Sequence, residues 1–215
     1  MTPYYVLYHG LIFCAFVLSL YCTMRRGKHY IFLSILLCLT LVIELFADYM
    51  EKRHIPFFWV YHLFVIIEYS LFCLHYLKTI STNYRWRAGL SIYLFAAFSF
   101  SVSWLVYHFK LFPGMNINLE GILLFILYTH LVFNLEVDRD IPIYMVPDFW
   151  IAVAVLLFYG GCFVCNGLFA PLTELKMGQP LDLYYIIIAP LNLVFYTFII
   201  IGLLCSIQKS RYFMR

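Results

Sequence analysis

The sequence carries little charge. Asp, Glu, Lys and Arg make up only 12% of its 215 residues, about half the share that is usual in a soluble domain, whereas 65% of the residues are hydrophobic. A chain of this length cannot bury so much apolar surface in one core, so we expect much of it to face lipid. The formal net charge is +3 and the basic residues are scattered. The basic patch that is typical of nucleic-acid-binding proteins is therefore missing, and we expect no nucleic-acid partner.

Several familiar motifs are missing as well. The sequence has no H-E-x-x-H, no G-x-x-x-x-G-K-[ST] and no G-x-S-x-G, which excludes the common zinc-protease, P-loop and hydrolase motifs. The last apolar run has no Lys, which excludes a retinal Schiff base. There is no Arg ladder of the voltage-sensor kind and no duplicated half of the secondary-transporter kind. A non-enzymatic role is therefore the leading interpretation, and we expect neither a cofactor nor a metal.

The seven cysteines do not indicate a disulfide framework. Most of them lie inside apolar runs, where a thiol packs as a small hydrophobic group. Cys162 and Cys165 form a C-x-x-C, for which a redox or metal-binding role is the alternative interpretation. The first apolar run is long and no small-residue cleavage site follows it, so we expect it to remain as a membrane anchor.

Long apolar runs are what the sequence has in abundance. A helix needs about 20 residues to span a membrane. Seven runs reach that length: 4–23, 30–50, 57–77, 88–109, 119–137, 149–169 and 183–207. Lipid offers the backbone no hydrogen-bond partner, so each run is expected to be an α-helix. The sequence predicts an all-α, polytopic membrane protein in which residues 1–215 form a single domain, a bundle of seven transmembrane helices in the lipid bilayer.

The orientation is predicted from the Lys and Arg residues between the runs, because these gather on the cytoplasmic side. With the N-terminus outside, the cytoplasmic segments hold ten of them: Arg25, Arg26, Lys28, Lys78, Arg85, Arg87, Arg139, Lys209, Arg211 and Arg215. The outer segments hold four: Lys52, Arg53, Lys110 and Lys176. This bias predicts an N-out, C-in, multi-pass protein of the inner (plasma) membrane.

Polar residues recur inside the apolar runs at helical spacing. Tyr61, Glu68 and His75 are seven residues apart and therefore share one face of the third run. Spacings of four or seven recur in other runs, at Glu44 and Asp48, His130 and Asn134, Tyr159 and Asn166, and Tyr185, Asn192 and Tyr196. A charged group at membrane depth costs several kcal/mol unless it is paired, protonated or next to water. These faces are therefore expected to point toward one another, inside the protein.

Under the N-out orientation the polar residues fall at two depths. We predict an outward-opening pocket for a small or lipidic ligand, with Glu68 near its floor and the following lining residues: Tyr61, His62, Glu68, Glu44, Asp48, Asn166 and Asn192. We predict a second, inner polar cluster from His75, His130 and Asn134. The alternative interpretation is that these groups only join helices through hydrogen bonds. For His62 and His75 this interpretation is favoured over ligand binding.

Two segments carry a resemblance to known proteins. They are YHLFVIIEY (61–69) and PDFWIAVAVLLFYGG (147–161). With them the chain resembles small seven-helix inner-membrane proteins of bacteria and is similar to the seven-helix membrane modules of some sensor histidine kinases. The resemblance implies a sensing role. The sequence has no kinase or other output domain after its last run, so a signal is expected to pass to a separate protein.

Three functional hypotheses stay open from the sequence. The leading one is a non-enzymatic membrane sensor or accessory protein, which binds its ligand in the polar pocket. It would signal to a cytoplasmic or membrane protein partner through the inner loops and the tail, 208–215. The second is a channel, pore or proton-coupled carrier in which Glu68 is a proton or cation site. The third is an intramembrane lipid enzyme, with Glu68 as acid or base beside His62 or His75; a pure scaffold is a further alternative.

Overall fold

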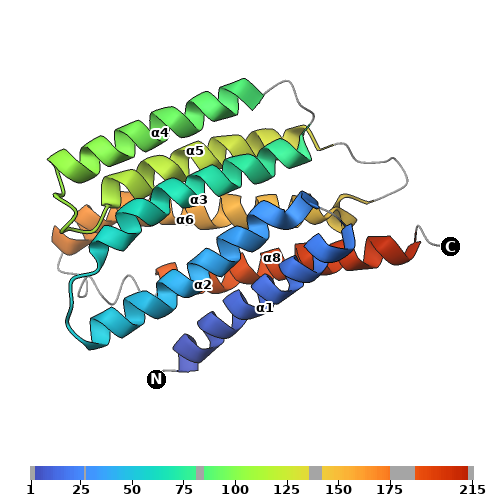
Figure 1. Ribbon diagram of the computed structural model, residues 1–215, viewed down its shortest axis with the longest axis horizontal. Coiled ribbons are helices and arrows are strands. Elements are labelled where there is room, and N and C mark those ends of the chain that lie inside the picture. Colours follow the sequence, from blue (N-terminus) through green and yellow to red (C-terminus); the bar gives the residue numbers. More distant parts are fainter. Residues whose placement is uncertain (1–2, 27, 81–84, 136–141, 175–186, 213–215) are drawn as a thin grey trace. The chain divides into compact units, whose positions relative to one another are not determined.

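The computed structural model describes residues 3–26, 28–80, 85–135, 142–174 and 187–212, and this part of the chain is helical throughout its regular structure (Figure 1). Seven helices in the described part are long and apolar enough to cross a membrane. They confirm the predicted all-α fold with seven transmembrane helices, and the chain is a multi-pass integral membrane protein in contact with the lipid bilayer. The N-out, C-in orientation stays a prediction.

The described elements follow one another as helices joined by short connections. They are α1 (Pro3–Arg26), α2 (Ile31–Lys52), α3 (Phe58–Thr79), α4 (Arg85–Leu105), α5 (Gly114–Phe133), α6 (Pro147–Glu174) and α8 (Ala189–Tyr212), with the 3-10 turns η1 (Lys28–Tyr30) and η2 (Ile143–Met145). Pro147 is the first residue of α6, where its fixed φ suits a helix and its missing N–H is not needed.

The contacts between helices divide the chain into two compact units. Unit 1 comprises Met1–Leu18 and Gly121–Arg215, and unit 2 comprises Ser19–Glu120. The prediction that residues 1–215 form a single domain stays a prediction.

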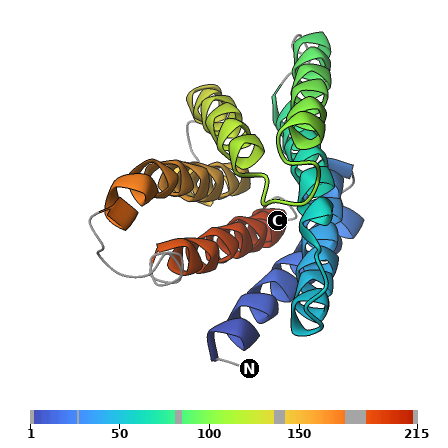
Figure 2. The same cartoon turned by 90° about the vertical axis from the view of Figure 1, so that its left-hand side faces the viewer.

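In unit 2, α3 is the central helix. It packs against α2 on one side and α4 on the other, as Figure 2 shows. The rings of Tyr69 on α3 and Phe95 on α4 lie 4.4 Å apart, centroid to centroid, and both side chains are buried. At the start of α2, the hydroxyl group of Ser34 shares a hydrogen bond of 3.0 Å with the hydroxyl group of Thr23, near the end of α1. The buried positions of α3 are therefore set by two neighbouring helices, and polar groups among them must find partners there.

In unit 1, α6 and α8 form the main helix pair. Phe158 and Phe195 meet across it with their ring centroids 4.9 Å apart. Gly202 of α8 lies so close to α6 that an added Cβ would be 2.8 Å from the Pro147 carbonyl oxygen. Tyr4 of α1 donates a hydrogen bond of 3.4 Å to the carbonyl of Ala189. Because Gly202 has no side chain, α8 can approach the start of α6 closely.

Candidate functional site

A polar site lies inside unit 2, where α3, α4 and the first turns of α5 meet. His62 of α3 is completely buried there and uses both ring nitrogens. Its Nε2 lies 2.9 Å from the carbonyl oxygen of Leu111 and its Nδ1 lies 2.7 Å from the Ser103 hydroxyl. A carbonyl oxygen only accepts, so Nε2 carries the hydrogen and donates to Leu111. In a neutral imidazole the Ser103 hydroxyl then donates to Nδ1.

Asn116 of α5 completes this arrangement. Its Nδ2 donates to the Ser103 hydroxyl at 2.9 Å and to the Ser99 carbonyl at 3.2 Å, both on α4. The two amide hydrogens are therefore used, and what remains is the acceptor Oδ1, which is buried without a hydrogen-bond partner among the described residues. His62, Ser103 and Asn116, which we call the neutral network, join three helices without any charge.

The loop after α4 supplies the Leu111 carbonyl to this network, and two residues of the loop have an unusual backbone conformation. His108 and Phe109 both have positive φ, 47° and 57°, which non-glycine residues rarely adopt. The Phe109 ring packs edge-on against His62, with the ring centroids 5.3 Å apart. Leu111 follows two residues later and accepts the His62 hydrogen bond. Strained backbone of this kind persists only where the surrounding contacts hold it in place.

Glu120 lies one helical turn beyond Asn116 and is buried, with 1% of its surface exposed. Its Oε1 has no hydrogen-bond partner within the part of the chain that the structure describes. Glu120 interacts electrostatically with Glu68, at the middle of α3. We call these two residues the carboxyl pair.

Further polar groups of α3 lie close to the carboxyl pair. Tyr69 and Cys73, one turn apart, each interact electrostatically with Glu120. The Tyr69 hydroxyl also shares a short hydrogen bond with the Ser91 hydroxyl of α4. Both Tyr69 and Cys73 are buried. The polar groups therefore continue along α3 beyond the neutral network, toward the middle of the helix and past it.

The carboxyl pair is costly where it lies. Two negative charges side by side repel each other, and burial removes the water that would stabilise them. Glu120 forms no ion pair with a Lys or Arg in the described part of the chain. The buried Glu120 Oε1 is therefore where a proton, a cation or a hydrogen-bond donor from a ligand would be accommodated. In the neutral network, by contrast, both ring nitrogens of His62 have a partner from the chain.

The other residues that were predicted for the outer pocket of unit 2 have different surroundings. Tyr61 makes ring contacts with Phe57 and Phe112, at centroid distances of 5.9 and 6.2 Å. Glu44 and Asp48 lie on α2, and Asp48 interacts electrostatically with charged neighbours on its own helix. The structure thus joins His62 to Ser103 by a hydrogen bond, and Glu68 interacts electrostatically with Glu120. The predicted ligand-binding roles of all these residues stay predictions.

The remaining predicted residues lie in unit 1 or outside the described side chains. Asn192 donates to the carbonyl of Ile188 at 3.1 Å, and Asn134 donates to that of His130 at 2.8 Å. Bonds of this kind return to the same helix and join no two elements. The side chain of Asn166 lies outside the described residues. The inner cluster of His75, His130 and Asn134 accordingly stays a prediction, with its members in different units.

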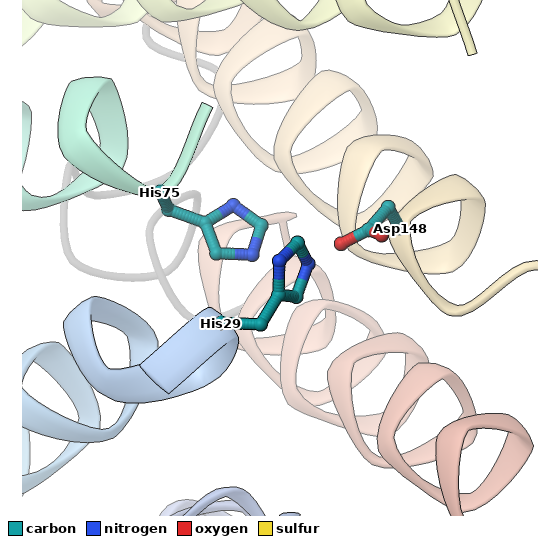
Figure 3. A group of neighbouring side chains, drawn as sticks. All are labelled: His29, His75 and Asp148. Atoms are coloured by element: carbon teal, nitrogen blue, oxygen red, sulfur yellow. The ribbon is translucent and has the colours of Figure 1, made fainter. Parts of the chain in front are cut away.

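His75 lies near the C-terminal end of α3, completely buried in unit 2. Its ring centroid is 6.0 Å from that of His29 and 6.4 Å from that of Tyr30, and Figure 3 shows the two imidazole rings close together. Asp148, which the same figure labels, belongs to the first turn of α6 in unit 1. Within unit 2 the two imidazoles supply only half of the four ligands of a typical zinc site. The ring contacts of His75 with His29 and Tyr30 indicate that these side chains pack together around η1.

Sequence reasoning missed half of the polar site. The fifth run was expected to span 119–137, but α5 begins at Gly114, which moves Asn116 from a loop onto the helix. Asn116 and Glu120 are four residues apart, as are Ser99 and Ser103 on α4. The same spacing rule that identified Glu68 would have found both pairs if the helix had been extended toward Pro113 and the serines had been counted as polar.

No protein-family model, curated protein or solved structure matches this chain. The features that point to a function are the carboxyl pair, the neutral network and the membrane-spanning helices.

Proposed function

We propose that the protein is a non-enzymatic sensor or accessory protein of the inner membrane, which binds a small ligand at the carboxyl pair and signals to a separate protein. The observation that carries this proposal is the electrostatic interaction between the half-buried Glu68 and the buried Glu120 in unit 2. Polar and ionisable residues at membrane depth mark functional sites more often than structural ones, because their cost is otherwise avoidable.

The neutral network strengthens this interpretation. It already joins α3, α4 and α5 through hydrogen bonds that need no charge. A carboxyl group is an expensive way to hold helices together, and here that task is performed one turn away by His62, Ser103 and Asn116. Binding a ligand is the role that would justify keeping Glu68 and Glu120 as acids.

The signal would pass through the packing of α3. A ligand that neutralises the carboxyl pair changes the interaction between α3 and α5, and α3 also packs against α2 and α4. With the N-terminus outside, the connection that follows α3 and the tail at 208–215 face the cytoplasm, where a partner would receive the signal. The resemblance to membrane modules of sensor kinases agrees with this arrangement.

The test compares Glu68→Gln and Glu120→Gln with the control Glu51→Gln, whose side chain is exposed at the end of α2. Native mass spectrometry of protein released in mild detergent measures bound ligands, and cross-linking in intact cells measures contacts with partners. We expect both site variants to fold in normal amount but to lose bound mass or change the cross-linked partners. Loss of folded protein, or behaviour equal to that of Glu51→Gln, would contradict the proposal.

A proton-coupled carrier is the second candidate. The observation that favours it is a row of polar side chains that extends over much of α3. The row consists of His62, Glu68, Tyr69 and Cys73. A carrier requires that protons or solute cross a sealed membrane. Flux in liposomes that depends on Glu120 would favour this function, and impermeability to protons and small ions would exclude it.

A further inference from the structure

We propose that Ser99, Asn116 and Glu120 form a binding site for a small monovalent metal cation such as Na⁺. This inference rests on the proposed function, since it names the class of ligand that the carboxyl pair would bind. All three side chains are buried, with exposures of 0%, 0% and 1%, and each has one oxygen without a hydrogen-bond partner among the described residues.

The three oxygens belong to one small region of unit 2. The amide of Asn116 donates to the Ser99 carbonyl at 3.2 Å, so the Asn116 and Ser99 side chains start from neighbouring points on α5 and α4. Glu120 follows Asn116 by one helical turn and therefore lies on the same face of α5. Three buried polar atoms without partners are unusual within so few residues, because buried polar groups are nearly always hydrogen-bonded.

The chemistry of these atoms restricts what can bind them. The Asn116 amide spends its donors on Ser103 and Ser99, which leaves only the acceptor Oδ1. Glu120 contributes a carboxyl oxygen and Ser99 a hydroxyl oxygen, so the site offers oxygen ligands and neither sulfur nor nitrogen. Carboxylate, carbonyl and hydroxyl oxygens suit hard cations.

Charge then selects a monovalent ion. The three groups bring one carboxylate, on Glu120, and with one proton shared between Glu120 and the neighbouring Glu68 a single monovalent cation neutralises the site. Glu68, Tyr69 and Cys73 of α3 interact electrostatically with Glu120, and none of them carries a positive charge that would compete with the cation. The neutral network holds Asn116 in position, because Ser103 is itself fixed by His62.

The test is the thermal unfolding of the full-length protein in detergent, measured in NaCl, KCl, MgCl₂ and choline chloride at equal ionic strength. A ligand that binds only the folded state raises the unfolding temperature, and a saturating rise of about 2–8 °C is expected in NaCl alone. Ser99→Ala removes an oxygen that has no partner, so this variant should fold normally and lose the rise. Ser101→Ala is the matched control, because Ser101 is exposed on the same helix and should keep the rise.

Three results would overturn the inference. Equal behaviour in all salts would mean that water alone satisfies the three oxygens, and a full Na⁺ effect in Ser99→Ala would place the ion elsewhere. A rise in MgCl₂ alone would exclude a monovalent site. The outcome is separable from that of the proposed function. If Na⁺ has no effect but the carboxyl-pair variants still change the partner contacts, only the cation inference fails. If Na⁺ acts through Ser99 but those contacts are unchanged, the cation site stands and the sensing role fails.

Discussion

At the scale of single residues, His62 shows how a polar side chain is kept inside a membrane protein. Both of its ring nitrogens are hydrogen-bonded, to Ser103 and to the Leu111 carbonyl, and no water is needed. The sequence left open whether His62 binds a ligand or joins helices. Its contacts favour the joining role, since both nitrogens have a partner from the chain.

The first prediction concerns this residue. His62→Leu removes both hydrogen bonds and leaves Leu111 and Ser103 without their partner, so we expect a loss of about 1–3 kcal/mol in the free energy of unfolding. Asn134→Leu is the control, because Asn134 is exposed and bonds only to its own helix. Its cost should be about 0.5 kcal/mol or less. Steric trapping in bicelles measures both values, and equal costs would contradict the assigned role of His62.

Glu68 and Glu120 show what a sequence reveals at this scale and what it does not. Glu68 stands out because it interrupts a long apolar run, and its importance could be predicted from the sequence. That Glu120 is the residue opposite could not be predicted, because spacing along one helix says nothing about which face of another helix meets it. The partner of a buried acid is decided by packing between helices.

At the scale of elements, the ends of helices were the least predictable feature. The fifth apolar run was placed too late because Gly114 and Asn116 interrupt its hydrophobic pattern, although the backbone is already helical there. Pro113 is the last residue before α5, and its carbonyl accepts a hydrogen bond of 3.1 Å from the backbone N–H of Ile117 in the first turn. A few residues at a boundary decided whether the neutral network was visible from the sequence.

The second prediction concerns the pairing of α6 and α8. Gly202→Ala would place a methyl group 2.8 Å from the Pro147 carbonyl oxygen, and backbone cannot move aside as a flexible side chain does. We expect a loss of about 1–3 kcal/mol in the free energy of unfolding. Gly89→Ala on α4 is the matched control, since nothing lies within 4 Å of its added methyl group. It should be neutral or stabilise by up to about 1 kcal/mol. Destabilisation by Gly89→Ala as large as that by Gly202→Ala would argue against this close approach.

At the scale of the whole molecule, the number of membrane-spanning helices was predictable from the sequence. Length and hydropathy identify each span by itself, because every backbone polar group in lipid must be satisfied within its own helix. The predicted number, seven, is confirmed in the described part of the chain, with bounds that differ for individual helices. How the helices group was not predictable, since the contacts between lipid-facing helices depend on side-chain shape and hydrogen bonds instead of on hydropathy.

The third prediction concerns orientation. The excess of Lys and Arg in the segments assigned to the cytoplasm predicts N-out, C-in. We expect Lys110→Cys to react in intact cells with a membrane-impermeant maleimide, and Arg139→Cys to react only after the membrane is opened. The wild-type protein controls for its seven native cysteines. The opposite labelling pattern would reverse the assignment of the inner loops and of the tail as the partner-binding side.

The central claim is that Glu68 and Glu120 act as one site. A double-mutant cycle of Glu68→Gln, Glu120→Gln and the double variant, with the free energy of unfolding measured in one choline-based buffer, tests it most directly. If the two carboxyl groups interact, either single change already relieves their repulsion, so the second change adds less, with a coupling energy of about 1 kcal/mol or more. Effects that add to within about 0.5 kcal/mol would show that the two residues are independent, and would contradict a shared ligand-binding site.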